Sequence, residues 1–226
     1  MSARTTALCA LIATRRQGAW SDGILKEYVQ RDRLERRDAA LAAALTYGVM
    51  QNRMLLDHYL EQVVSGGLSR LQPAMLDILR LGAYQLLLLD KIPDSAAVNE
   101  AVEQTKRYVN QKAAGMTNGA LRALSRKKGS LNEPRDLATK YSHPQALVEL
   151  LMQSVGENQI EPFLRADNEP APTCLQINPL LSDPDEVERA LTEQEILFRK
   201  HPWLPGCYLV TGTGNLARLE LFASGK

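Results

Sequence analysis

The stretch MLDILRLGAYQLLLLDKIPDSAAVNEAVEQTKR, residues 75–107, contains two apolar-patterned segments separated by a proline turn. In both segments apolar residues recur three and four positions apart, the spacing of one buried helical face. Pro93 disfavours helical backbone at Ile92, and Asp94 or Ser95 is placed to cap the next helix. Small Gly82 would let another helix come close. The stretch therefore predicts a tightly packed pair of helices.

The polar pair Asn99-Glu100 near the start of the second segment has two interpretations, the edge of a reactive site or a packing feature. Asn99 borders the buried stripe, and Glu100 lies in the positive first turns of the helix, where an acid is favoured. The pattern indicates no nucleophile, base or metal ligand nearby. We interpret the pair as structural, a packing and hydrogen-bonding feature.

The same helical spacing extends from residue 4 to residue 127. Ala7, Leu8, Leu11 and Ile12 share one face, which favours a first core helix over a targeting peptide. Residues 38–64 predict one long helix, or two that break near Gln51-Asn52. Pro73 is placed to start the next helix, where its missing N–H costs nothing. A last helix is expected to be capped by Asn118.

The sequence pattern changes from helical to mixed helix and strand after the polar linker KKGSLNEPRD, residues 127–136. A helix is expected after Pro144, and His143 is expected to set the entry into it. Beyond it, TCLQIN, ILFRK and CYLVTG predict strands, and DPDEVERALTEQE predicts a helix that starts at Asp183 or Asp185. The predicted fold class is mainly α: a helical bundle over residues 1–130, then linker helices and a small α+β domain over residues 131–226.

The net charge of +1 hides a division between these parts. Residues 1–130 hold 19 Lys and Arg against 12 Asp and Glu, whereas residues 131–226 hold 8 against 14. A basic module favours a polyanionic partner, because Lys and Arg supply most phosphate contacts. No apolar run approaches the roughly 20 residues that span a bilayer. We expect a cytoplasmic protein with no membrane contact.

Metal binding and thiol chemistry are not indicated. Cys9, Cys174 and Cys207 are far apart and lack C-x-x-C spacing, which favours a reducing compartment. The three histidines lie in separate elements and form no ligand pair or triad. We therefore predict no metal site.

Several long motifs carry a family resemblance. Residues 75–107, together with MTNGALRAL at 116–124, resemble the NusB-like helical domain of bacterial antitermination factors, a domain that also opens the Sun/Fmu (RsmB) family of 16S rRNA cytosine-5 methyltransferases. YSHPQALVELL, NEPAPTCLQIN and GTGNLARLELFASGK resemble the small RNA-binding segment that follows in that methyltransferase family. The resemblance covers nearly the whole chain and implies a NusB-like bundle followed by that small domain.

The resemblance also implies chemistry outside these residues. Members of the family continue into a doubly wound domain that binds S-adenosylmethionine and holds two active-site cysteines, one of them the nucleophile. None of the three cysteines here follows a proline, so no catalytic role is carried over to them. We expect S-adenosylmethionine as the cofactor of a full-length member and no cofactor, and no catalysis, in this chain alone.

One motif is typical of a nucleotide loop. Gly212, Gly214 and Ala217 fit the pattern G-x-G-x-x-[GA] after an apolar strand. The phosphate-binding loop also needs a following helix and a second strand, and only nine residues follow Ala217. We predict a turn here; a small enzyme with a nucleotide cofactor is the minor alternative.

Two groups of basic residues are the candidate RNA contacts. One group lies at helix ends in the first third of the chain and also contains Arg31; the other lies on the last two helices or just beyond and also contains Lys112. The predicted RNA-binding residues are Arg15, Arg16, Arg33, Arg36, Arg37, Lys106, Arg107, Arg122, Arg126, Lys127 and Lys128. The structural alternative is a set of solvated helix ends, with residues 126–128 complementing the dipole of the last helix. The resemblance favours 16S rRNA as the partner of these cations.

The rival function is a non-enzymatic NusB-like antitermination factor that binds RNA with a ribosomal-protein partner. Such factors open with an arginine-rich segment, and this chain has only Arg4 there. Antitermination-type binding through the N-terminus is therefore not expected.

Overall fold

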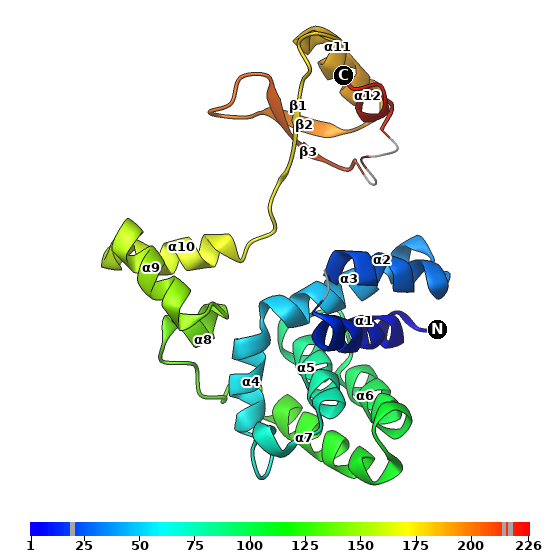
Figure 1. Ribbon diagram of the computed structural model, residues 1–226, viewed down its shortest axis with the longest axis vertical. Coiled ribbons are helices and arrows are strands. Elements are labelled where there is room, and N and C mark those ends of the chain that lie inside the picture. Colours follow the sequence, from blue (N-terminus) through cyan, green and yellow to red (C-terminus); the bar gives the residue numbers. More distant parts are fainter. Residues whose placement is uncertain (19–20, 214–215, 217–218) are drawn as a thin grey trace. The chain divides into compact units, whose positions relative to one another are not determined.

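The protein is described by a computed structural model that covers residues 1–18, 21–213, 216 and 219–226. The chain forms two compact units, Met1–Asn168 and Glu169–Lys226. Figure 1 shows that the first unit is entirely helical and that the second combines helices with a small sheet. The predicted fold class, a helical bundle followed by a small α+β domain, is confirmed.

Seven helices make up the bundle of the first unit. They are α1 (Ala3–Gln17), α2 (Ser21–Arg31), α3 (Arg36–Gln51), α4 (Arg53–Glu61), α5 (Pro73–Leu88), α6 (Asp94–Tyr108) and α7 (Ala114–Arg126). Two short 3₁₀ turns, Leu68–Arg70 and Gln111–Ala113, precede α5 and α7. Three further helices follow in the same unit: α8 (Leu137–Tyr141), α9 (Gln145–Val155) and α10 (Glu157–Asp167).

Most predicted helix boundaries are confirmed, and two are wrong. The break near Gln51-Asn52 separates α3 from α4, and Pro73 occupies the first turn of α5. Pro93, which has no capping side chain, holds the N-cap position of α6, and Asp94 lies inside the first turn. Asn118 lies inside α7, because that helix already begins at Ala114 after the 3₁₀ turn.

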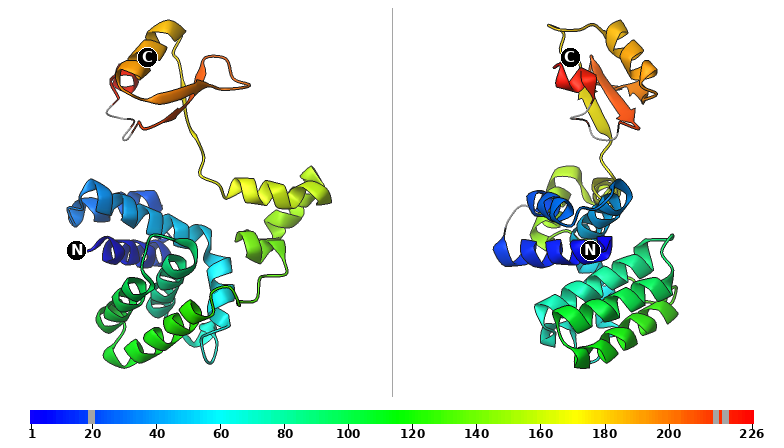
Figure 2. Two further views of the ribbon diagram at one scale, coloured as in Figure 1. Left: turned by 180° about the vertical axis from the view of Figure 1, so that it is seen from behind. Right: turned by 90° about the vertical axis from the view of Figure 1, so that its right-hand side faces the viewer.

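The core of the bundle is built around α5 and α7. Ile78 and Leu79 of α5 and Leu121 and Leu124 of α7 are fully buried, together with Leu8, Leu45, Leu56, Leu60 and Leu81. The helices α5, α6 and α7 pack against one another, as both views of Figure 2 show. The predicted close approach at Gly82 is present, since Leu121 packs directly over it. The stretch of residues 75–107 therefore forms the centre of the unit.

The polar pair Asn99-Glu100 has a partly structural role. Ser2 is the N-cap of α1, and its Oγ donates to Glu100 Oε1 at 2.8 Å. Glu100 thus ties the start of α1 to α6, which confirms its structural interpretation. Asn99 is exposed, so the packing role expected for it is wrong.

The helices α8–α10 extend the first unit beyond the bundle. The backbone N–H of Leu55 in α4 donates to Ser142 Oγ at 3.0 Å. His143 contacts the carbonyl of Tyr141 through Nδ1 (2.7 Å) and Asp167 through Nε2 (2.9 Å), and so joins the entry of α9 to the end of α10. Through these contacts α8–α10 belong to the first compact unit, which ends at Asn168. The predicted domain boundary at residue 130 stays a prediction.

The second unit contains a three-stranded antiparallel sheet. Its strands are β1 (Thr173–Gln176), β2 (Leu197–Lys200) and β3 (Cys207–Thr211), in the order β1-β3-β2, with α11 (Pro184–Glu193) between β1 and β2 and the short α12 (Glu220–Ala223) after β3. This arrangement is a split βαβ unit, with β3 inserted between two parallel strands. Asp183 caps α11 by accepting from Glu186 N at 2.9 Å. The predicted strands and the capped helix are confirmed.

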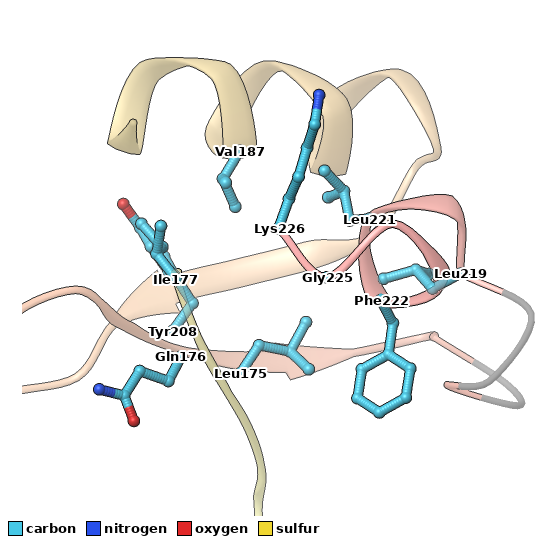
Figure 3. A pocket seen from close by; sticks show the side chains of 10 residues that line it. All are labelled: Leu175, Gln176, Ile177, Val187, Tyr208, Leu219, Leu221, Phe222, Gly225 and Lys226. Atoms are coloured by element: carbon cyan, nitrogen blue, oxygen red, sulfur yellow. The ribbon is translucent and has the colours of Figure 1, made fainter. Parts of the chain in front are cut away.

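One face of this sheet packs against the helices. Tyr208 and Val210 of β3 are buried with Val187 and Leu191 of α11 and Leu221 of α12. A pocket of about 320 Å³ is lined mainly by apolar side chains of this sheet face and the two helices. Figure 3 shows these side chains. Lys226 at its edge is paired with Glu186. The pocket is an incompletely filled part of the hydrophobic core of the unit.

Candidate nucleic-acid interface

The predicted RNA-binding residues lie at helix ends, as the sequence indicated. Arg15 and Arg16 are in the last turn of α1, and Lys106 and Arg107 are in the last turn of α6. Arg33 follows α2, and Arg36 and Arg37 open α3. Arg122 lies within α7, whose end carries Arg126, Lys127 and Lys128.

Some of these cations already have a protein partner. Arg15 Nε contacts buried Asp77 Oδ2 at 2.9 Å, Lys106 pairs with Glu103 at 2.6 Å, and Lys128 pairs with Asp94 at 2.6 Å. Two more donate to neutral groups: Arg122 to Asn118 Oδ1 and Lys127 to the Gln62 carbonyl. In these five residues the side chain already contacts another group of the protein, so their positions are explained by the stability of the fold.

The remaining arginines are open to an external anion. Arg16, Arg33, Arg36, Arg37 and Arg126 are exposed, and none makes a side-chain hydrogen bond or ion pair within the described ranges. Arg33 has a positive φ of 50°, the left-handed conformation in which the chain turns from α2 to α3. These side chains can exchange water for phosphate oxygens without first breaking an internal ion pair.

The bundle brings the ends of α1 and α6 to one place. Arg16, Arg31, Tyr28 and Tyr108 line a shared pocket of about 270 Å³, and the Arg107 guanidinium lies 5.3 Å from the centre of the Tyr108 ring. Cations far apart in sequence are therefore neighbours here, as a phosphate-binding surface requires. We call this set of residues the α1–α6 basic site.

The cations of α7 form a second, separate group. Lys128 pairs with Asp94 at the start of α6, whereas Tyr108 is the last residue of α6. A helix of this length places its two ends about 20 Å apart at a rise of 1.5 Å per residue. The cations at the end of α6 and those at the end of α7 are therefore about one helix length apart.

The electrostatics of the α1–α6 basic site keep its charge positive. The Arg31 guanidinium holds the pKa of the Asp32 carboxyl below its ordinary value. Burial, and then the contact with Cys9, raise the pKa of Tyr108 to about 12, so the phenol is neutral at physiological pH. The Asp32 carboxylate pairs with Arg31, while Arg16 and Arg107 have no ion pair among the described residues, so the site keeps a positive surplus.

Part of this site was missed at the sequence level. The rings of Tyr28 and Tyr108 and the Cys9 thiol were not identified, although Tyr28 precedes Arg31 by one helical turn and Tyr108 follows Arg107 directly. Aromatic residues beside arginines at helix ends are the signal that could have indicated them. Their proximity depends on the packing of α1, α2 and α6, which no local pattern reveals.

A buried ion network beside Arg15 was also unforeseen. Arg80 in α5 donates through Nε and Nη2 to the two oxygens of Asp57, each at 2.7 Å. Its Nη1 lies 3.6 Å from Asp77 Oδ1, and Asp77 accepts from Arg15 on the other side. The network joins α1, α4 and α5 and assigns Arg15 a structural partner.

The other predictions concern metal binding, the glycine motif at residues 212–217 and membrane spanning. Among the described residues, no group of three or more His, Cys, Asp and Glu is placed to hold a metal ion. Gly212 has a φ of 86°, which suits the predicted turn, while Gly214 and Ala217 lie outside the described residues. No helix in the described part of the chain has both the length and the hydropathy to span a bilayer.

Comparison with known proteins agrees with this architecture. Residues 1–126 match the NusB family, and residues 143–216 match the family described as "Methyltr_RsmF/B-like, ferredoxin-like domain". The protein is thus of the class that joins a NusB helical domain to a ferredoxin-like domain. The chain belongs to the NusB family, and over its full length it matches the N-terminal half of RsmB-like methyltransferases.

Individual relatives show how much of such proteins the chain represents. It is 33% identical over 230 residues to the probable ribosomal RNA small subunit methyltransferase B of Bacillus subtilis (strain 168), covering all of this chain and 51% of the relative. The crystal structure of PH0851 is 19% identical, with a TM-score of 0.66, and matches 98% of this chain and 52% of that one. The chain thus spans about half the length of these relatives.

The bundle also resembles a solved RNA complex. The crystal structure of antitermination factors NusB and NusE in complex with dsRNA is 25% identical, with a TM-score of 0.51, and covers 55% of this chain and 93% of that one. The similarity is limited to about the length of the NusB domain.

Proposed function

We propose that this chain is the RNA-docking region of an S-adenosylmethionine-dependent 16S rRNA (cytosine-5) methyltransferase. It positions ribosomal RNA for methylation by a domain outside these residues. The observation that carries the proposal is the match, over the whole chain, to the N-terminal half of a relative named a ribosomal RNA small subunit methyltransferase. The α1–α6 basic site supplies the surface for docking.

The exposed cations favour recognition by phosphate contacts and shape. Among the described residues, Arg16 of this site and Arg36 and Arg37 at the start of α3 have exposed guanidinium groups without a side-chain partner, and such groups bind phosphate oxygens bidentately. Side chains cannot read base sequence in the closed major groove of A-form RNA, so docking on a helix is by backbone geometry. The chain fixes the position of the RNA, and the identity of the methylated base is read elsewhere.

The methyl donor has no site assigned in this chain. S-adenosylmethionine carries a charged sulfonium and a ribose, and the pocket of the second unit offers mainly apolar side chains to such a molecule. We assign the cofactor and the nucleophilic cysteine to the proposed catalytic domain. Placement in the cytoplasm, where ribosomal RNA is assembled, stays a prediction.

The test is a mobility-shift titration of the chain with a 16S rRNA fragment at 50 and 200 mM salt. If phosphates are the main contacts, affinity falls steeply with salt, because each neutralised phosphate releases counterions. An affinity that stays the same at both salt concentrations would overturn docking by the basic site.

A second candidate function is a non-enzymatic antitermination factor that binds RNA and a ribosomal protein. The similarity to the complex of NusB, NusE and dsRNA favours it. The genomic reading frame separates the two proposals. A frame that continues past Lys226 into a glycine-rich cofactor loop and a Pro-Cys motif supports the methyltransferase, whereas a stop codon there supports the factor.

A further inference from the structure

The pocket of the α1–α6 basic site combines aromatic rings with cations. It lies between α1, α2, the start of α5 and the end of α6, and the lining residues used below are Cys9, Ile12, Arg16, Tyr28, Arg31 and Tyr108. Its volume of about 270 Å³ is at the small end of ligand pockets, which run from roughly 300 to 1,000 Å³. The size suits a single nucleobase.

The guanidinium of Arg31 is held as a fixed plane at this pocket. Its carbon Cζ lies 4.1 Å from the centre of the Tyr28 ring. Its Nε and Nη2 donate to the two oxygens of Asp32 at 2.8 and 3.0 Å, and Asp32 also accepts from Thr6 Oγ1 at 2.7 Å. The Asp32 side chain is only 4% exposed, whereas that of Arg31 is 44% exposed. One face of the cation is covered by Tyr28, so the other face remains for a planar ligand.

The opposite wall is aromatic and neutral. The Tyr108 hydroxyl lies 3.4 Å from Cys9 Sγ, a hydrogen bond that fixes the ring against α1. The Arg107 guanidinium lies 5.3 Å from the centre of this ring, and Arg16 lines the pocket without an ion pair in the described residues. The pocket lining thus includes the Arg31 guanidinium, two tyrosine rings and the Arg16 cation, with the Arg107 cation close to one of the rings.

We infer that this pocket receives one unpaired nucleotide of the bound RNA. The base stacks on the fixed Arg31 plane and contacts the Tyr108 ring, while its phosphate contacts Arg16 and Arg107. Bases stack on guanidinium planes and aromatic rings whatever their identity, so the pocket selects an unpaired base rather than a sequence. A phosphate alone would not need the rings, and an apolar ligand would not need three arginines. The inference rests on the proposed RNA docking and adds the local RNA structure that the site selects.

The test compares two RNAs that differ by one nucleotide. A fully paired 16S stem and the same stem with a single-nucleotide bulge are titrated with the full 226-residue chain. We expect about tenfold tighter binding of the bulged stem, since stacking of one base contributes roughly 1–3 kcal/mol. Arg31→Lys keeps the charge and removes the plane, and Tyr108→Leu removes the ring. Each should reduce the preference for the bulge and leave binding of the paired stem within about twofold.

The control variant is Lys91→Glu. Lys91 is exposed in the loop between α5 and α6, at the opposite end of these helices from Ala74 and Tyr108. It should keep the bulge preference. Thermal unfolding of each variant shows whether the fold is retained. Equal affinity of the wild type for both RNAs overturns the inference, as does a bulge preference that survives in both pocket variants.

A titration with a single nucleotide instead of an RNA stem tests this inference independently of the docking proposal. Cytidine 5′-monophosphate is titrated while the tyrosine ring resonances are followed by NMR, with inorganic phosphate as the matched probe. Shifts of Tyr28 and Tyr108 with the nucleotide but not with phosphate support the pocket even if RNA docking fails its salt test. Identical shifts with phosphate reduce the site to an anion site and overturn the stacking role.

Discussion

Gly82 of α5 lies directly against Leu121 of α7, so that a Cβ atom added to Gly82 would be 2.6 Å from Leu121 Cδ1. Leu121 is fully buried. The absence of a side chain at residue 82 therefore sets the distance between α5 and α7.

Gly82→Ala is expected to destabilise the first unit by about 1–2 kcal/mol. Overpacking typically costs about 1–3 kcal/mol, and the higher helix propensity of alanine relative to glycine offsets up to about 1 kcal/mol of that cost. The control is Gly119→Ala in α7, where a Cβ atom meets nothing within 4 Å and stability should rise slightly. Urea unfolding monitored by circular dichroism measures both. Equal stabilisation by the two alanines would contradict the close approach.

Arg80→Met is expected to destabilise by about 3–5 kcal/mol. The substitution leaves Asp77, whose side chain is 7% exposed, with Arg15 alone, and it leaves Asp57 without its bidentate partner. Lys106→Met removes the more exposed pair with Glu103 and should change stability by no more than about 1 kcal/mol. The comparison uses chemical unfolding at pH 7. Similar costs for the two variants would show that the Arg80 network is not buried in solution.

Asp94 should contribute to acid sensitivity. Its hydrogen bonds with Lys128 and then Ser125 lower the carboxyl pKa in the folded state. A group with a depressed folded pKa stabilises the protein above its unfolded pKa, about 3.9 for Asp, and loses that contribution as pH falls through the folded value. Asp94→Asn should therefore be destabilising at pH 7, and its cost should decrease as the pH falls below about 3.9. Lys128→Met should reproduce this pH dependence, and a cost that does not change with pH would contradict the ion pair.

Charge reversal should locate the RNA surface. Arg36→Glu with Arg37→Glu, or Lys106→Glu with Arg107→Glu, should weaken binding of a 16S fragment and make its salt dependence shallower by about one per lost phosphate contact. Lys91→Glu is the control at the far end of the α5–α6 pair and should change neither quantity much. Unchanged affinity in both double variants would place the RNA on the α7 cations or elsewhere.

The local signals in the sequence were sufficient for most elements. Pro73 and Pro93 act on their own backbone, and the apolar spacing of residues 75–107 depends only on neighbouring positions, so these helices were predictable. Asn118 does not cap a helix, because it lies inside α7. Its Oδ1 accepts a hydrogen bond from Arg122 Nε one turn further along the same helix. A capping residue type does not by itself fix the boundary.

The candidate site was only partly predictable for a different reason. Basic residues at helix ends are visible in the sequence, but whether each is free depends on contacts across the fold. Arg15 meets Asp77 across 62 positions, and Cys9 meets Tyr108 across 99. Such pairs arise from helix packing, which no short window of sequence encodes.

The strand order of the second unit also has a consequence for the order of biosynthesis. β3 follows β1 and β2 in the sequence and is the middle strand of their sheet, and β1 and β2 pair with it rather than with each other. While a ribosome makes the chain, the helical unit can fold first, since domains generally fold as units from the N-terminus. The segments of β1 and β2 then have no partner strand until Cys207–Thr211 leaves the exit tunnel, and the sheet can form only after that.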